Sequence, residues 1–268
     1  MGLFRSIVFA LLVLALPVTL VATNIRFAAS EVRVYDYSVR EYNAAAVSRI
    51  PESELLRANR ELLSYFTADD PAPLNIVVTN TNGEQGTLFN ARETAHLADV
   101  RELFRGLFTV QALALALTLT LAVVLIATAS LRVLAQALLY GSSLTIALAG
   151  ATGGLAALGF EQAWRQFHFL AFTNDLWLLN PATDHLIQMF PEPFWLDITI
   201  LIGAFTLLQV LLIGGASGLY MYLTRSEEPE EQPPRHLPVP RPLEPRPRIP
   251  SPRPRHPATS RTRPDEVL

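Results

Sequence analysis

Four long apolar segments separate the polar parts of the chain. No Asp, Glu or Arg interrupts any of them, and each approaches or exceeds the roughly 20 helical residues that cross a bilayer. The segments are Ile7–Ala22, Leu107–Ser130, Val133–Phe160 and Ile198–Leu223. The pattern predicts a polytopic α-helical membrane protein with four transmembrane helices.

The first apolar segment has two interpretations. Arg5, a short apolar run and Pro17 also fit a secretory signal peptide, with cleavage after Ala22 or Ala29. Neither cleavage site is a good one, so we favour a retained transmembrane helix.

The distribution of arginine predicts the orientation. Arg5 precedes the first segment, Arg132 lies between the second and third, and Arg225 begins an arginine-rich tail. Loop 160–196 has only Arg165 against four carboxylates. Because cytoplasmic loops are enriched in basic residues, both termini should lie in the cytoplasm, with segment 27–106 and loop 160–196 outside.

The polar segment 27–106 predicts a small mixed α+β cap outside the membrane. Val32 and Val34 alternate with charged residues, as in a strand with one wet face. Pro51 is placed to begin a helix, which Asp69-Asp70-Pro71 should end. Asn82-Gly83 favours a tight hairpin turn. The expected apolar helix face is Leu55, Leu56, Leu62, Leu63 and Phe66, and the expected hairpin strands are Ile76–Thr79 and Thr87–Phe89.

The C-terminal segment has a different composition. From Pro229 onward it contains 13 of the 20 prolines, mixed with arginine. Such a segment cannot bury enough apolar surface to fold, so we expect a disordered cytoplasmic tail. A tail partner with an SH3-like domain or an anionic lipid surface is the alternative. The predicted organisation is a helix at 1–26, the cap at 27–106, three helices at 107–223 with the outer loop 160–196, and the tail at 224–268.

Composition narrows the chemistry. Charged residues make up 17% of the 268 residues, below the roughly 25% of soluble domains, and the net charge is −3. All 21 basic residues are arginine, which excludes Schiff-base and P-loop lysines. The absence of cysteine excludes disulfides, a thiol nucleophile and zinc–thiolate sites on this chain.

The first candidate site segment is 88–104, just before the second apolar segment. Residues three and four apart share a helix face, so Arg92, His96 and Asp99 should lie together. Asn90 and Glu93 have the spacing of a capping box. From this segment alone, a juxtamembrane helix covered with ion pairs is the favoured interpretation.

The second candidate segment is 167–195. Its aromatic residues are typical of a membrane-interface belt. His168 and Asp175, in contrast, are polar groups among large apolar side chains, where unpaired polarity is costly. His185 falls in a polar turn and is predicted to be a surface residue. The remaining histidines, His236 and His256, belong to the tail.

Both segments should meet over one membrane face, bringing His96 and His168 together. The residues alone leave two interpretations open. The first is acid–base catalysis by a histidine pair. The second, the lesser one, is a zinc or manganese site that also uses Asp99 and Asp175. We predict no cofactor.

The two segments resemble the signature regions of a bacterial integral membrane family, DUF1461, which includes the lipoprotein intramolecular transacylase. The family pattern is approximately LFNxRExxHMxDVKxLF followed by FHxxFFxNDxWxLxPxxDxLIxMFPExFF. This chain has Leu97 for Met, Arg101 for Lys, and Ala171 and Trp195 for two Phe positions. The resemblance covers residues 1–223 and leaves out the tail.

The resemblance implies acyl transfer in the bacterial plasma membrane. The substrate would be a diacylglyceryl lipoprotein, whose sn-2 acyl chain moves to the α-amine of its N-terminal cysteine. The two essential histidines of the family align with His96 and His168. We expect His96 to be the main general base and His168 a second proton carrier or an oxyanion stabiliser. Six supporting residues complete the expected site: Asp99 and Asp175 to orient the imidazoles, Arg92, Asn90 and Asn174 to bind polar atoms of the substrate, and Glu93 in the helix cap.

Two other functions stay open. The lysine-free composition and the Pro/Arg tail indicate a high-GC bacterium, and a distant member of such a family is free to act on another lipid or peptide. A non-enzymatic membrane scaffold or lipoprotein-binding protein would use the same spans. The histidines distinguish these functions, because a scaffold tolerates their loss and an acyltransferase does not.

Overall fold

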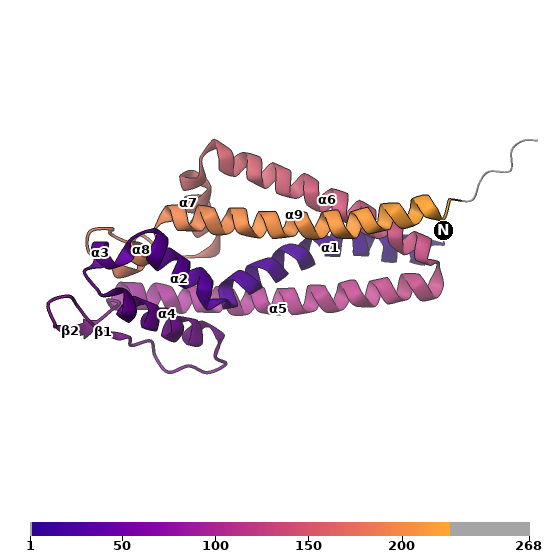
Figure 1. Cartoon of the computed structure of the whole chain (residues 1–268). Coiled ribbons are helices and arrows are strands. Elements are labelled where there is room, and N and C mark those ends of the chain that lie inside the picture. The colour runs from indigo at the N-terminus through magenta and orange to yellow at the C-terminus, as the bar shows by residue number, and fades with distance from the viewer. Residues whose placement is uncertain (1, 226–268) are drawn as a thin grey trace, which may run out of the picture. The chain divides into compact units, whose positions relative to one another are not determined.

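The computed structural model describes residues 2–225 and is dominated by helices (Figure 1). The expected disordered tail, its proposed partner, His236 and His256 lie outside the described residues. Four long helices run side by side as a bundle, and shorter elements gather at one end. The long helices are α1 (Leu3–Ser30), α5 (Ala91–Thr128), α6 (Leu131–Leu158) and α9 (Glu192–Leu223).

All four long helices are long and apolar enough to cross a membrane. Helices α1 and α9 contain their predicted segments whole, whereas α5 and α6 each end two residues before the predicted segment does. At their N-termini, α1 and α5 begin before the predicted segments. Helix α1 packs against α5, α6 and α9. The approach of α1 to α6 is close, because a Cβ atom added to Gly141 would lie 2.8 Å from Cδ2 of Leu16. Small residues at such crossings allow membrane helices to pack tightly.

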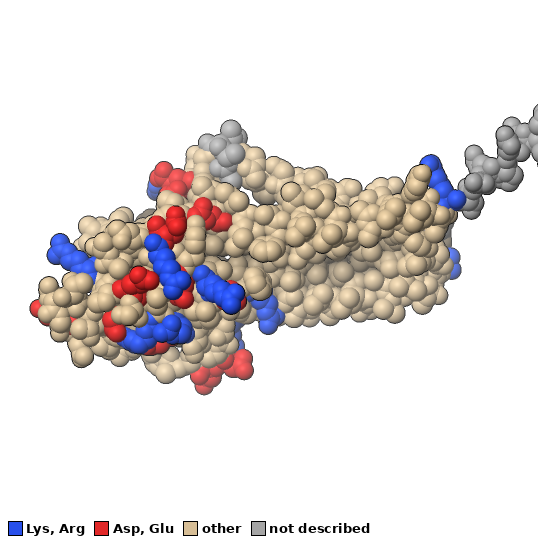
Figure 2. All heavy atoms as spheres, viewed as in Figure 1, with Lys and Arg blue, Asp and Glu red and all other residues tan. Residues whose placement is uncertain are grey.

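Helix α5 is longer than a bilayer requires. Its 38 residues extend for about 57 Å at roughly 1.5 Å per residue, against a hydrocarbon core of about 30 Å. All of its charged residues lie between Arg92 and Arg105, and its apolar part begins at Leu107. The first turns of α5, His96 included, therefore lie outside the membrane-spanning part. Figure 2 shows the same division, with charged side chains gathered at the end that carries the short helices.

The segment between α1 and α5, here called the cap (residues 31–90), begins with a helix and not with the predicted strand. Helix α2 spans Val32–Glu41, and the side chain of Glu31 accepts a hydrogen bond from the backbone of Arg33 at its start. Tyr35 and Val39 are buried four residues apart, which is helical spacing. The prediction failed because two alternating valines are too short a pattern to outweigh this longer periodicity.

The rest of the cap follows the predicted elements closely. Helix α3 is Ala44–Ser48, and α4 is Glu52–Thr67, starting directly after Pro51. Strands β1 (Val77–Thr79) and β2 (Gln85–Thr87) pair antiparallel, with Val78 opposite Gly86. The second strand lies two residues earlier than predicted, and the loop is longer than a two-residue turn. Gly83 in that loop has a φ of 83°, the conformation that favours glycine.

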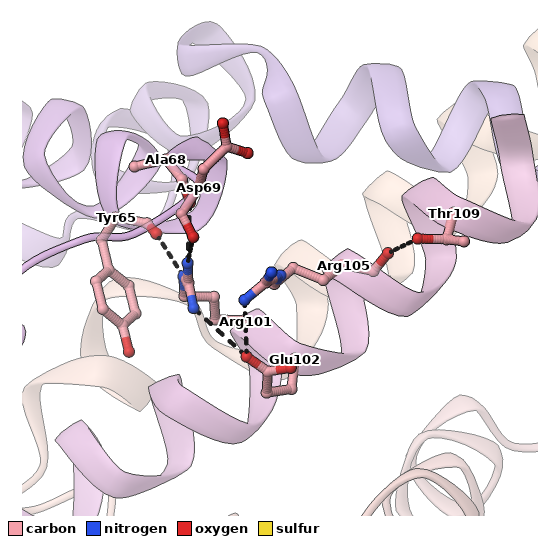
Figure 3. Close-up of polar contacts among 7 residues, drawn as sticks. All are labelled: Tyr65, Ala68, Asp69, Arg101, Glu102, Arg105 and Thr109. Atoms are coloured by element: carbon pink, nitrogen blue, oxygen red, sulfur yellow. Dashed lines mark hydrogen bonds and ion pairs between the residues drawn. The ribbon is translucent and has the colours of Figure 1, made fainter.

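Arg101 fastens α4 to α5 (Figure 3). Its guanidinium donates to the backbone oxygens of Tyr65, Ala68 and Asp69 at 2.9–3.0 Å, where the last carbonyls of α4 lack helical partners. Arg101 is only 8% exposed, so it acts as a buried C-terminal cap for α4.

One apolar core joins the cap to the site segments. Leu55, Leu62, Leu88 and Leu97 are at most 2% exposed and cluster with residues that follow α7 (Phe160–Ala171) in the chain. Those later residues are Met189, Phe190, Phe194 and Ile198. The two signature segments, about 80 residues apart, are thereby packed into a single core.

Candidate active site

His96 and His168 lie side by side, as the sequence predicts. His96 is on the second turn of α5, and His168 is on α7 (Phe160–Ala171). Their ring centroids are 6.2 Å apart, and the residues are 6% and 8% exposed. His168 is the buried residue of α7, whose other side chains are largely open to their surroundings. Helix α7 therefore presents one imidazole to α5.

A backbone carbonyl fixes the tautomer of His168. Its Nδ1 lies 2.8 Å from the oxygen of Trp164, one helical turn earlier. Because a carbonyl only accepts, Nδ1 carries the proton in the neutral ring and Nε2 has the free lone pair. Burial lowers the pKa of His168, which keeps the ring neutral near pH 7. His168 is therefore arranged to accept a proton at Nε2.

His96 has a different environment. Burial, followed by the neighbouring His168, lowers its pKa to about 4, against a smaller opposing effect of Asp99. Its Nδ1 is buried and has no hydrogen-bond partner among the described residues. Buried N–H groups without acceptors are rare, so the tautomer with the proton on Nε2 is favoured. His96 is therefore a neutral ring that is a weak base and an N–H donor.

Aromatic rings surround the histidine pair. Phe172 lies 5.1 Å from His96 and 5.6 Å from His168 between ring centroids. Trp164 and Trp177 lie 4.7 and 4.9 Å from His168. These rings give the histidine pair a largely apolar surrounding.

Two contacts tie the loop after α7 to α5. Nδ2 of Asn174 donates to Oδ2 of Asp99 at 2.9 Å, and Arg92 donates to the backbone oxygen of Asp175. The oxygens of Asn174 accept from Leu176 N and Trp177 Nε1, which holds Trp177 against His168. We call these the outer contacts of the loop.

The outer contacts correct the role expected for the two aspartates. Neither carboxylate orients an imidazole, because Asp99 is paired with Asn174 and Asp175 lies beside Arg92. The Trp164 carbonyl orients His168 instead. A group of three or more His, Cys, Asp or Glu side chains placed to hold a metal is absent from the described residues 2–225.

A second, buried set of contacts joins the N-terminus of α5 to the chain before α9. Asn90 and Glu93 form the predicted capping box. Glu93 is 0% exposed, and its other oxygen accepts from the backbone of Leu186 at 2.7 Å. Nδ2 of Asn90 donates to Asp184 at 3.0 Å. Asn90 therefore joins the start of α5 to Asp184, and its expected contact with the substrate stays a prediction.

Sequence reasoning missed two members of this buried set. Asp184 is 7% exposed and also accepts from the backbone of Asn180. His185, predicted to be a surface residue, is half-buried at the start of α8 (His185–Met189), with Nδ1 2.7 Å from the oxygen of Leu88. One signal was available in the sequence: both residues lie inside the second signature segment, where they match the family pattern. A solvent-exposed polar turn would have no reason to match it.

Comparisons with known proteins agree with this geometry. The sequence profile of the family described as lipoprotein intramolecular transacylase Lit matches residues 10–195. No curated protein matches the chain. The fold is similar to the in meso structure of the membrane integral lipoprotein intramolecular transacylase Lit from Bacillus cereus, with a TM-score of 0.70 and 21% identity over 83% of this chain and 97% of that one. A structure of the same protein with a His-to-Ala mutation gives a TM-score of 0.68 and 19% identity over 84% and 96%.

Proposed function

The chain belongs to the lipoprotein intramolecular transacylase family, and we propose that it moves the sn-2 acyl chain of a diacylglyceryl lipoprotein to the α-amine of the N-terminal cysteine. It is a multi-pass membrane protein, so its substrate's lipid can reach it within the bilayer. The observation that carries the proposal is the buried pair His96 and His168, 6.2 Å apart among aromatic rings.

The reaction balances without a cofactor. The neutral amine attacks the ester carbonyl carbon, a C–N bond forms, and the carbonyl oxygen becomes an oxyanion. The C–O bond to glycerol then breaks. One proton leaves the amine nitrogen, and one proton reaches the glycerol oxygen. Because the amine and the ester belong to one molecule, positioning supplies much of the rate enhancement.

The hydrogen bonding supports a division of roles opposite to the one expected from sequence. Nε2 of His168 has a free lone pair, so this ring takes the amine proton and returns it to the glycerol oxygen. His96 has a pKa of about 4 and is a poor base, so its N–H donates to the oxyanion. Both histidines enter the reaction as neutral rings, and His168 is an imidazolium only between taking the amine proton and returning it.

The aromatic rings and the outer contacts complete the proposed site. Phe172, Trp164 and Trp177 exclude water from the reacting carbonyl and leave an apolar lining for the acyl chain. The pairs Asp99–Asn174 and Arg92–Asp175 position the loop, and thereby Trp177, instead of binding the substrate.

The arginine distribution supports placing this site at the outer face of a bacterial plasma membrane, with both termini in the cytoplasm. A lipoprotein whose diacylglyceryl group lies in the outer leaflet would share that leaflet with the site. The cap would then lie outside, as would loop 160–196.

The first test is tandem mass spectrometry of a reporter lipoprotein's N-terminal peptide. The chain is co-expressed with the reporter in a host that lacks other N-acylating enzymes. Total mass does not change on intramolecular transfer, so fragment ions must locate the acyl chain. We expect an N-acylated, mono-acylglyceryl cysteine. A free amine with both chains on glycerol, despite good expression, would contradict the proposal and favour another acyl substrate or a lipoprotein-binding role.

The histidine variants distinguish an enzyme from a scaffold. Both His168→Gln and His96→Gln keep a polar side chain of similar size. His168→Gln should lower the rate by about 10²–10⁴-fold, the usual contribution of proton transfer. His96→Gln should lower it by about 10²–10³-fold, the usual contribution of an oxyanion donor. Glu84→Gln, in the exposed hairpin loop, is the matched control and should leave the rate unchanged. Full activity of either histidine variant at normal expression would refute that histidine's role.

A further inference from the structure

A hollow that neither His96 nor His168 lines lies between α2 and α9. Its volume is about 430 Å³, and it is lined by Arg33, Val34, Tyr37, Asp197, Ile198 and Leu201. We call it the α2–α9 hollow. Ile198 belongs to the apolar core and Val34 packs against it, but the hollow also brings together a cation, an anion and an aromatic ring that the core packing does not require.

The carboxylate of Asp197 is organised by two tyrosines. The hydroxyls of Tyr37, at 2.7 Å, and of Tyr42 both donate to Oδ2. Within residues 2–225, Oδ1 receives no hydrogen bond and stays free for a ligand. The two tyrosine rings stand edge to face, with centroids 6.2 Å apart. A fixed carboxylate beside tyrosine faces is the environment that attracts an ammonium group.

The guanidinium of Arg33 supplies the opposite charge. Its side chain is 90% exposed, and its nearest carboxylate, Glu31, is 3.9 Å away, at the outer limit of an ion pair. Most of its N–H donors are therefore available to a phosphate, which guanidinium binds well. Acid and base line the same hollow, so a ligand with both charges finds a partner for each.

The position of the hollow along α9 indicates a lipid. Asp197 is the last charged residue before the apolar run that begins at Ile198. Leu201 lines the hollow, and Phe205 and Leu208 continue along α9 with 44% and 52% exposure. A molecule bound at Asp197 would therefore extend its apolar part along the membrane-facing surface of α9.

We propose that the α2–α9 hollow binds a zwitterionic aminophospholipid, with the ammonium at Asp197 and Tyr37 and the phosphate at Arg33. A phosphatidylethanolamine headgroup carries both charges, with two carbons between them, and an acyl chain lies over Leu201 and Phe205, which are 38% and 44% exposed. The site holds a structural lipid next to the cap and is independent of the acyl-transfer reaction.

Lipid competition with the purified full-length chain tests the site. The chain is incubated with equal amounts of phosphatidylethanolamine and phosphatidylglycerol of identical acyl chains, and bound lipid is counted by native mass spectrometry. Phosphatidylglycerol has the phosphate without the ammonium. We expect the chain to bind phosphatidylethanolamine about tenfold more than phosphatidylglycerol, because one charge-assisted hydrogen bond changes an affinity by about that factor. Equal binding, or a preference for phosphatidylglycerol, overturns the proposal.

The Asp197→Asn variant isolates the ammonium contact. Asparagine retains an oxygen for the tyrosine hydroxyls, so the cap packing is preserved while the charge is lost. The preference should disappear, and Arg33→Gln should weaken both lipids. Glu161→Gln, a carboxylate on α7 that does not line the hollow, should keep the preference. If Asp197→Asn does not fold, Tyr37→Leu gives the same test through the ring. A preference retained in Asp197→Asn, or in Tyr37→Leu where that variant replaces it, overturns the site.

The histidine variants separate this proposal from the acyl-transfer proposal. A His96→Gln, His168→Gln chain should bind phosphatidylethanolamine like the parent. If the parent chain shows no transacylation yet retains the lipid preference, only the proposed function fails.

Discussion

One backbone carbonyl makes two similar residues chemically different. Trp164 oxygen accepts from Nδ1 of His168, which leaves Nε2 as a base, whereas Nδ1 of His96 has no partner. Both rings are buried to nearly the same degree. The two rings therefore differ in proton affinity because of their hydrogen bonds and not because of their burial. The hydrogen-bond acceptor of His168 comes from its own helix α7, in which Trp164 precedes His168 by one turn.

The burial of His96 predicts a pH-dependent stability. Its pKa falls from 6.5 in the unfolded chain to about 4 in the fold, so the unfolded chain binds the proton first as the pH decreases. The stability that neutral His96 provides is complete above pH 6.5 and is lost toward pH 4. At pH 5 the loss is about 2 kcal/mol. Thermal unfolding in detergent measures it.

His96→Leu is the control for this titration. Leucine does not bind a proton, so the variant should lose less stability than the parent between pH 7 and pH 5, whatever its stability at pH 7. An equal decrease in both proteins would mean that other groups titrate and that His96 does not have the lowered pKa.

Helix α7 depends on its neighbours for its position. Its side chains other than His168 are mostly exposed, so it has little core of its own. The segment that follows α7 contacts α5 at two places. The first is the exposed outer contacts, and the second is the buried hydrogen bond between Glu93 and the backbone of Leu186. An exposed polar pair adds about 0–1 kcal/mol to the free energy of unfolding. A buried polar group that loses its hydrogen-bond partner lowers that free energy by about 1–3 kcal/mol.

This contrast predicts separate effects for two α5 variants. Glu93→Ala leaves the backbone N–H groups of Asn90 and Leu186 without their acceptor, so it should reduce the free energy of unfolding by about 2–4 kcal/mol. Asp99→Ala should cost less than about 1 kcal/mol but lower the acyl-transfer rate, because Asn174 and Trp177 lose their anchor. Thermal unfolding and the peptide assay measure the two. Equal destabilisation by both variants would contradict the division into outer and buried contacts.

The sequence predicted the bundle well because long apolar runs and helix caps are local signals. The four long helices, the capping box at Asn90 and Glu93, and helix α4 all follow from short-range patterns. It failed where contacts between distant segments decide the structure. Val32 and Val34 lie in a helix whose apolar face packs on the core, and Asp184 and His185 are recruited by residues about 90 positions earlier. The partners of Asp99 and Asp175 were wrong for the same reason.

The orientation of the whole molecule in the membrane can be tested with single cysteines, because the chain has no cysteine of its own. Glu84→Cys places a thiol in the exposed hairpin loop of the cap, and Ser130→Cys places one in the exposed turn between α5 and α6, at the opposite end of α5. With both termini in the cytoplasm, a membrane-impermeant maleimide should label Glu84→Cys in intact cells and Ser130→Cys only after permeabilisation. The unchanged chain is the control, since it has no thiol. The reverse labelling pattern would place the histidine pair in the cytoplasm, and a lipoprotein with its N-terminus outside could not be the substrate.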